Sequence, residues 1–326
     1  APFPPAKRHE GIYGDLEIST PSTMDDFTTT ADNKPMWVQN QRNSWHGVDF
    51  PYHEDLDVTE YKRNYFKALT AVDESVGRVI EHLRQSGELD NTIIVYMGDN
   101  GFMFGEHGLI DKRNAYEESM RVPLIAFAPG RLPEAETIES LVANIDIAPT
   151  LLDFAGIDEA PSQFEGESFV SLSRGEGDAS SWRKELLYEY YWEYNYPHTP
   201  TTFALRGDRF KFVTYHGVWD REELYDLQAD PQEKVNLIND GRYDDVRVSM
   251  RHRLFEMLQH NGGRHAVPYN ARTSVGAVLR SDAGAKGAQF PGEWMREGTP
   301  CDRIAIIVRD GKKRRERFER DCGKAP

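Results

Sequence analysis

The stretch that decides the fold is Asn91-Thr92-Ile93-Ile94-Val95-Tyr96-Met97-Gly98-Asp99-Asn100-Gly101. Its first seven residues are mostly apolar and β-branched without alternation, which is typical of a strand buried on both faces of a parallel sheet. Gly98 and Gly101 then let the backbone turn sharply. Since ligands of parallel α/β sheets bind beyond the carboxyl ends of strands, Asp99 and Asn100 are the first candidate site residues.

Helix and strand signals surround this stretch. Apolar side chains recur at spacings of three and four over residues 59–86, which predicts a helix capped by Thr59 and ended by Gly87. A second buried strand is predicted over residues 122–128, followed by a helix with Asp146 at its N-terminus. The order helix, strand, loop, strand, helix predicts an α/β fold.

The sequence changes in character after residue 156. Strands are predicted over residues 185–194, 203–215 and 222–227, and an amphipathic helix over residues 246–258. They indicate a smaller α+β region built on a short antiparallel sheet. We therefore expect an α/β portion over residues 1–156, an α+β subdomain over residues 157–262, and an extension of unknown role over residues 263–326.

Composition sets the broad class of protein. The chain has 326 residues, of which 39% are hydrophobic, so a sizeable core is expected. Its net charge of -15 argues against nucleic acid or an anionic membrane as a general partner. No stretch is long and apolar enough to span a bilayer, and no zinc motif is present. Cys301 and Cys322 could pair in an exported protein, but the sequence leaves this open.

Polar residues after the strand are suited to binding ions. Asp99 and Asn100 offer two hard oxygen ligands, which suit Ca²⁺ or Mg²⁺ better than zinc, although Ca²⁺ needs six to eight. Lys112 could bind an anionic group, and His107 could protonate a leaving oxygen near neutral pH. Taken singly, each residue also fits an ordinary turn or loop.

Motifs that follow one another along the chain make the interpretation more specific. They are Val72-Asp73-Glu74-Ser75-Val76-Gly77, Gly98-Asp99-Asn100-Gly101, Gly105-Glu106-His107-Gly108, Asp111-Lys112, Tyr116-Glu117-Glu118, Arg121-Val122-Pro123-Leu124-Ile125, Phe164-Glu165-Gly166-Glu167-Ser168 and Glu223-Leu224-Tyr225-Asp226-Leu227. As a set, they resemble the C-terminal core of the type I sulfatases, in the alkaline phosphatase superfamily, over about residues 1–260. The resemblance implies part of an alkaline-phosphatase-like parallel sheet with helices.

The resemblance also implies roles for individual residues. Asp99 and Asn100 would be two of the metal ligands, usually of Ca²⁺, with Mg²⁺ possible. The residues implied for the sulfate ester are Lys112 at the sulfate group, His107 near the leaving group, and His198 and Arg206 at the substrate. A simple turn in the sequence Asn195-Tyr196-Pro197-His198 is an equally good account of His198.

The chain also departs from the family pattern. Family members carry a C-x-P-x-R or S-x-P-x-R motif, whose Cys or Ser becomes the formylglycine nucleophile, in an N-terminal half that this chain lacks. In relatives a sulfate-contacting His precedes a Pro-rich segment similar to Ala1-Pro2-Phe3-Pro4-Pro5. We therefore expect the N-terminal half of the same enzyme as a partner, and expect residues 1–326 alone to be inactive.

The expected activity of the parent enzyme is hydrolysis of a sulfate monoester on a small molecule or carbohydrate. The aromatic segment 188–196 favours a sugar, because aromatic faces stack on sugar rings, although core packing explains it equally well. A phosphonate monoester or phosphodiester hydrolase is one alternative. A non-catalytic fragment, or one piece of a split or nicked enzyme, is another. By analogy with the family, we expect a periplasmic or secreted protein.

Overall fold

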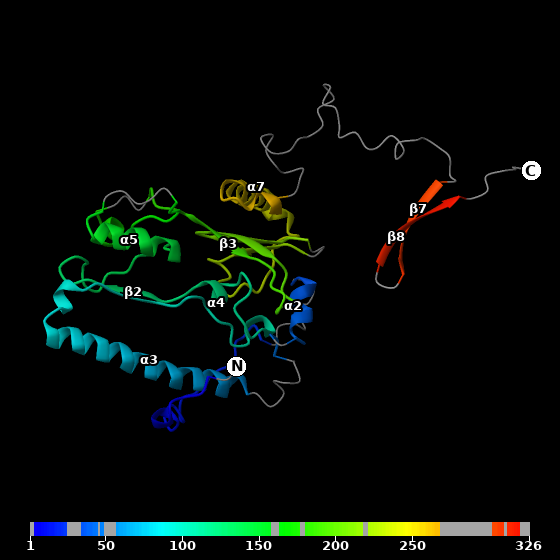
Figure 1. The fold of residues 1–326 in the computed structure, drawn as a ribbon. Coiled ribbons are helices and arrows are strands. Elements are labelled where there is room, and N and C mark those ends of the chain that lie inside the picture. Colours follow the sequence, from blue (N-terminus) through cyan, green and yellow to red (C-terminus); the bar gives the residue numbers. More distant parts are fainter. Residues whose placement is uncertain are drawn as a thin grey trace, which may run out of the picture. The chain divides into compact units, whose positions relative to one another are not determined.

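The computed structural model describes residues 3–24, 34–44, 46–48, 57–157, 163–176, 180–217, 221–267, 302–309 and 312–319. By its contacts the chain forms two compact units, residues 1–271 and 272–326. The main elements of the first unit are α2 (Met36–Gln41), α3 (Val58–Ser86), β1 (Ile94–Met97), α4 (Glu117–Met120), β2 (Leu124–Phe127), α5 (Ile147–Phe154), α6 (Val170–Ser173), β3 (Glu185–Tyr190), β4 (Thr202–Gly207), β5 (Phe210–Tyr215), β6 (Glu223–Asp226) and α7 (Asp244–His260). Figure 1 shows their arrangement. The divisions expected after residues 156 and 262 stay predictions.

Helix α3 confirms the predicted helix, with one change at its start. The Asp57 carboxylate accepts a hydrogen bond from the Thr59 backbone N–H at 2.8 Å, so Asp57 is the cap in place of Thr59. The helix ends at Gly87 in the left-handed conformation, with φ 75°, as predicted. Only Tyr61 and Lys67 of this helix are buried, so most of its apolar face is not covered by the described residues.

Strands β1 and β2 run side by side, but in opposite directions (Figure 1). Ile94 pairs with Phe127 and Met97 with Leu124, which makes the pair antiparallel. We expected parallel strands buried on both faces, and neither feature holds for this pair, since Ile125 is 63% exposed. A continuous apolar run indicates burial in the complete fold, but it contains no information about strand direction.

The predicted short antiparallel sheet is confirmed, in the order β3-β4-β5-β6. Residues 203–215, predicted as one strand, form the hairpin of β4 and β5 with a turn at Asp208 and Arg209. Leu205 lies opposite Phe212 in this hairpin. Helix α7 packs against the sheet, as Figure 1 shows, and completes its core. The fully buried side chains of this core are Phe203, Leu205, Phe212, Leu224, Leu254 and Leu258.

Helix α5 begins after Asp146, as predicted, although this carboxylate does not cap the helix. It accepts the backbone N–H of Ala143 at 2.7 Å and of Glu167 at 2.9 Å, and it pairs with Arg183. Gly166 is required beside it, because a Cβ there would lie 2.1 Å from the Ile145 carbonyl oxygen. The sequence motif around Gly166 therefore marks a close backbone contact.

The second unit contains an antiparallel hairpin of β7 (Asp302–Arg309) and β8 (Lys312–Glu319). Cys301 and Cys322 lie outside the described residues. Within the described part of the chain, no helix combines the length and apolarity that a membrane crossing requires.

Candidate active site

The Gly98–Gly101 turn is held at both ends by backbone hydrogen bonds. The Gly98 N–H donates to the Pro123 carbonyl at 3.3 Å, and the Gly101 N–H donates to the Ser119 carbonyl at 2.9 Å. A Cβ on Gly101 would lie 2.0 Å from the Glu118 carbonyl oxygen, so this position needs glycine. The turn is therefore fixed against the end of α4 and the start of β2.

Two hard oxygens of this turn are available to a ligand. Asp99 is exposed, and its Oδ1 accepts the Asn100 backbone N–H at 2.9 Å. The Asn100 amide nitrogen donates to the Gly101 carbonyl at 2.8 Å. No described residue donates to the second carboxylate oxygen of Asp99 or to the Asn100 amide oxygen. These atoms fit a calcium or magnesium ion as part of a ligand set. Elsewhere in the described chain, no group of three or more His, Cys, Asp and Glu side chains could complete such a set.

The backbone of Lys112 is hydrogen-bonded to α4, the same short helix that holds the turn. The Ser119 hydroxyl donates to the Lys112 carbonyl, while the Ser119 carbonyl accepts the Gly101 N–H. The Lys112 side chain is half-buried, and its ammonium has no partner among the described residues. The structure thus joins the backbone of the turn and the backbone of Lys112 to one residue, the buried Ser119.

His107 lies in the interior, away from solvent. It is 2% exposed and its ring packs on Tyr116, with 4.2 Å between ring centroids. Burial, together with the nearby charges of Lys34 and Lys211, lowers the pKa of His107 well below its usual value. A neutral, enclosed imidazole does not support the predicted contact with a leaving group; it supports a packing role under the loop that precedes Lys112.

The sequence neighbours of Lys112, Asp111 and Arg113, belong to a polar and aromatic cluster. Arg113 donates to Asp111 at 2.8 Å, and its guanidinium lies 3.4 Å from the centroid of the Tyr196 ring. The His46 ring lies 5.1 Å from the Tyr196 centroid, and its Nδ1 is 3.3 Å from Asp111. His198 is exposed in the same loop as Tyr196. Sequence reasoning missed His46, which has no local signal.

Arg206, the other predicted substrate residue, is engaged inside the protein. Its guanidinium lies 3.4 Å from the Glu117 carboxylate, which also accepts from the fully buried Lys211 at 2.9 Å. Burial alone would raise the pKa of Glu117, but the two cations outweigh burial and lower it. A substrate contact by Arg206 would therefore require breaking its pair with Glu117.

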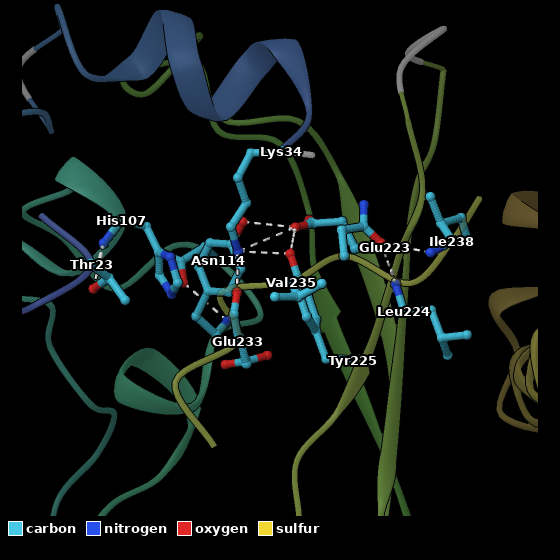
Figure 2. A network of polar contacts seen from close by, with 12 residues as sticks. Thr23, Lys34, His107, Asn114, Glu223, Leu224, Tyr225, Glu233, Val235 and Ile238 are labelled. Carbon is cyan, nitrogen blue, oxygen red and sulfur yellow. Dashed lines mark hydrogen bonds and ion pairs between the residues drawn. The ribbon is translucent and has the colours of Figure 1, made fainter. Parts of the chain in front are cut away.

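A buried polar network lies beside these residues (Figure 2). The Lys34 ammonium donates to the Tyr225 hydroxyl at 2.7 Å and to the Glu233 carbonyl at 2.6 Å, and lies 4.3 Å from the Tyr116 ring centroid. The hydroxyls of Tyr116 and Tyr225 both donate to Glu223. Burial lowers the pKa of Lys34 to about 8, although Glu223 and Glu233 oppose this shift. The network joins the antiparallel sheet to the segment that leads into α4.

Comparisons with known proteins agree with this geometry. The sulfatase family model matches residues 15–157, and a model described as N-sulphoglucosamine sulphohydrolase, C-terminal, matches residues 105–260. The N-acetylglucosamine-6-O-sulfatase of Bacteroides thetaiotaomicron is 42% identical over 186 residues, and the choline-sulfatase of Rhizobium meliloti is 36% identical over 197 residues. The matches cover 56% and 58% of this chain but 33% and 36% of those proteins, so the chain spans about a third of their length.

Solved structures share the fold. The structure of BT4656 with its substrate D-glucosamine-2-N,6-O-disulfate has a TM-score of 0.67 and 29% identity, over 81% of this chain and 64% of that one. The phosphonate monoester hydrolase SpPMH from Silicibacter pomeroyi has a TM-score of 0.65 and 25% identity, over 78% of this chain and 53% of that one. The fold is therefore alkaline-phosphatase-like. Within that superfamily, the chain belongs to the type I sulfatase family, whose models match it between residues 15 and 260.

Proposed function

We propose that this chain is the C-terminal part of a sulfatase that hydrolyses a sulfate monoester of an amino sugar. One observation carries the proposal: Ser119 hydrogen-bonds both to the turn that contains Asp99 and Asn100 and to the backbone of Lys112. Two hard oxygens and one unpaired ammonium, carried on segments that Ser119 joins, are suited to a metal ion and a tetrahedral oxyanion. The amino sugar is supported by the relative that acts as an N-acetylglucosamine-6-O-sulfatase.

Each residue of the turn has a defined part in this proposal. Asp99 and Asn100 would hold Ca²⁺ or Mg²⁺ as two members of its ligand set. A bound divalent ion supplies positive charge where negative charge develops on the sulfuryl oxygens. Lys112 binds a sulfate oxygen as a point charge, and the bond from Ser119 to its carbonyl fixes where its side chain starts.

The cluster beside Lys112 supports a sugar as the alcohol part of the ester. The Arg113 guanidinium offers hydrogen-bond donors to hydroxyl groups, and the buried Asp111 carboxylate holds it in place. Tyr196 lies under the Arg113 guanidinium and belongs to the loop that carries His198, which we propose faces the substrate. Exposed aromatic rings of that loop offer faces on which further sugar units stack. They are Tyr191 (46% exposed), Trp192 (50%) and Tyr194 (85%).

The proposed protein partner is the N-terminal half of the same enzyme, which would bring the formylglycine nucleophile and further metal ligands. The curated relatives, about three times as long as the matched region, support this partner. Exposed apolar side chains on α3 and β2 support it as well, because such side chains gain free energy when a partner removes them from water. Examples are Val79 (56% exposed), Ile125 (63%) and Phe127 (45%). By family analogy, we propose a periplasmic or secreted location.

A phosphonate monoester or phosphodiester hydrolase is the second candidate. It is favoured by the likeness to the Silicibacter pomeroyi enzyme and by a 30% identical relative, the multifunctional alkaline phosphatase superfamily protein PehA of Trinickia caryophylli. A sulfate monoester and a phosphonate monoester both present tetrahedral oxyanions, so the metal ligands and Lys112 would serve both. The assay must therefore compare the two esters directly.

The test uses the complete enzyme, in which these residues follow a segment with C-x-P-x-R or S-x-P-x-R. We expect hydrolysis of glucosamine 6-sulfate to exceed that of an aryl phosphonate. Lys112→Ala should lower kcat/KM for the sulfate ester by about 100-fold or more, because a charge at the reacting oxyanion is lost. Lys184→Ala, at an exposed lysine beside β3, is the matched control. Full activity of Lys112→Ala, or activity of residues 1–326 alone, would refute the proposal.

A further inference from the structure

Helix α4 is the point at which the two parts of the candidate site meet. The Ser119 carbonyl accepts the Gly101 N–H at 2.9 Å, and the Ser119 hydroxyl donates to the Lys112 carbonyl. Ser119 is 2% exposed, so water does not compete for these bonds. The position of α4 therefore determines how the candidate metal-binding turn and the Lys112 backbone lie relative to each other.

A carboxylate distant in sequence holds the start of this helix. Glu233 Oε2 accepts the Glu117 backbone N–H at 2.7 Å, across 116 positions of sequence. The first N–H groups of a helix have no partner inside it, so this bond satisfies a donor that would otherwise be buried and unpaired. The N-cap residue, Tyr116, offers no side-chain cap of its own.

Glu233 is itself tightly constrained. It is fully buried and adopts φ 51°, a left-handed conformation that is unusual for a residue other than glycine. Its Oε1 lies 2.7 Å from the Lys211 ammonium, and its carbonyl accepts from Lys34 at 2.6 Å. Figure 2 shows Glu233 beside the end of the Lys34 side chain, where the two are hydrogen-bonded. Unfavourable backbone conformations of this kind persist where surrounding contacts enforce them.

We propose that Glu233 is a positioning residue of the site: by holding the first N–H of α4, it fixes the distance between the Asp99 and Asn100 turn and Lys112. It touches no reacting group in this role and acts only through α4 and Ser119. The expected effect of Glu233 on kcat rests on the proposed sulfatase function. Its expected effect on the order of α4 and the turn does not, so the two effects are tested in separate experiments.

The structural experiment is hydrogen exchange on the 326-residue chain, followed by peptide mass spectrometry. Glu233→Ala removes both the acceptor for Glu117 and the charge beside Lys211, and we expect exchange in peptides over residues 98–120 to become at least tenfold faster. Glu233→Gln keeps an amide oxygen as an acceptor, so its effect should be smaller. Protection should therefore fall in the order wild type, Gln variant, Ala variant.

The matched control is Glu222→Gln. Glu222 precedes β6, and its partners are Thr214 at 3.0 Å and Arg251, both outside α4. It should leave exchange over residues 98–120 unchanged. Unchanged exchange there in both Glu233 variants would overturn the proposal, and so would an equal loss of protection in α3, β4 and α7. If the Ala variant does not fold, the Gln variant decides.

The catalytic experiment uses the complete enzyme with a sulfate ester. Misplacing Lys112 relative to the turn should lower kcat about tenfold for Glu233→Gln while KM changes little, because binding of the rest of the substrate is untouched. A raised KM with unchanged kcat would contradict the positioning role. If the wild-type enzyme hydrolyses no sulfate ester, the proposed function fails, and the hydrogen-exchange result still decides on Glu233.

Discussion

At the scale of single residues, Glu118 combines a largely buried carboxyl group with an oxygen that no described residue satisfies. Its Oε2 has no hydrogen-bond partner among the described residues. Burial raises the pKa of Glu118 to about 7, and the carboxylates of Glu233 and Glu106 add to the shift. The folded chain therefore holds this proton more tightly than the unfolded chain does. The stability that results is present below about pH 4 and is lost as the pH rises through about 7.

Replacing this carboxyl group should stabilise the protein at alkaline pH. Glu118→Gln cannot ionise, so we expect it to raise the free energy of unfolding by about 1–3 kcal/mol at pH 8, and by almost nothing at pH 4. Urea unfolding at the two pH values measures this difference. The exposed Glu165, changed to Gln, is the control and should show no such dependence. An equal effect of Glu118→Gln at both pH values would mean that ionisation is not the cause.

The residues that could be found from sequence are those with a local signal. Asp99, Asn100 and Lys112 stand in short motifs after a strand, and their side chains keep acceptors and a donor unused in the described structure. Ser119 and Glu233 carry no such signal, because Glu233 reaches Glu117 from 116 positions away. A contact of that kind depends on the tertiary fold alone, so no spacing rule could indicate it.

At the scale of helices and strands, the wrong predictions have identifiable physical causes. Leu205 and Phe212 face the same core from neighbouring strands, so the apolar pattern continues across the turn between β4 and β5. The segment 203–215 therefore looked like one strand, although Gly207-Asp208 is a hairpin signal. Elements that depend on local periodicity, such as α3 and α7, were predicted within a few residues.

The close contact between the Gly98–Gly101 turn and α4 gives a prediction at the same scale. Gly101→Ala places a Cβ 2.0 Å from the Glu118 carbonyl, so the turn and the helix must separate. We expect a loss of about 1–3 kcal/mol in the free energy of unfolding, measured with urea, because overpacking at a backbone contact cannot relax easily.

Gly77→Ala serves as the contrasting variant for that measurement. Gly77 lies within α3, and a Cβ there meets nothing within 4 Å. Alanine should stabilise the protein by about 0.5–1 kcal/mol, because glycine in a helix interior is entropically costly. Equal effects of the two substitutions would show that the turn and α4 do not touch as described.

At the scale of the whole molecule, two observations indicate that a further part of the protein covers this chain: some elements leave apolar side chains exposed, and the curated relatives are longer than the matched region. The antiparallel sheet has a buried core beneath α7, whereas α3 and β2 leave large apolar side chains exposed. The chain spans about a third of its curated relatives. Of these two elements, β2 was predicted to be buried on both faces, whereas α3 was predicted to have one apolar face. They identify the surface that we propose the N-terminal half covers.

The incomplete ligand set predicts weak calcium binding by this chain alone. Asp99 and Asn100 supply two oxygens, whereas Ca²⁺ takes six to eight, so we expect a dissociation constant of about 1 mM or weaker. Isothermal titration at fixed ionic strength measures it, with Asp99→Asn as the variant that should abolish binding. Asp73→Asn, on the exposed side of α3, is the control for general acidic attraction. In the complete enzyme the affinity should rise at least 100-fold, since further ligands join the same ion. Micromolar binding by residues 1–326 that survives Asp99→Asn would place the calcium site elsewhere in the chain.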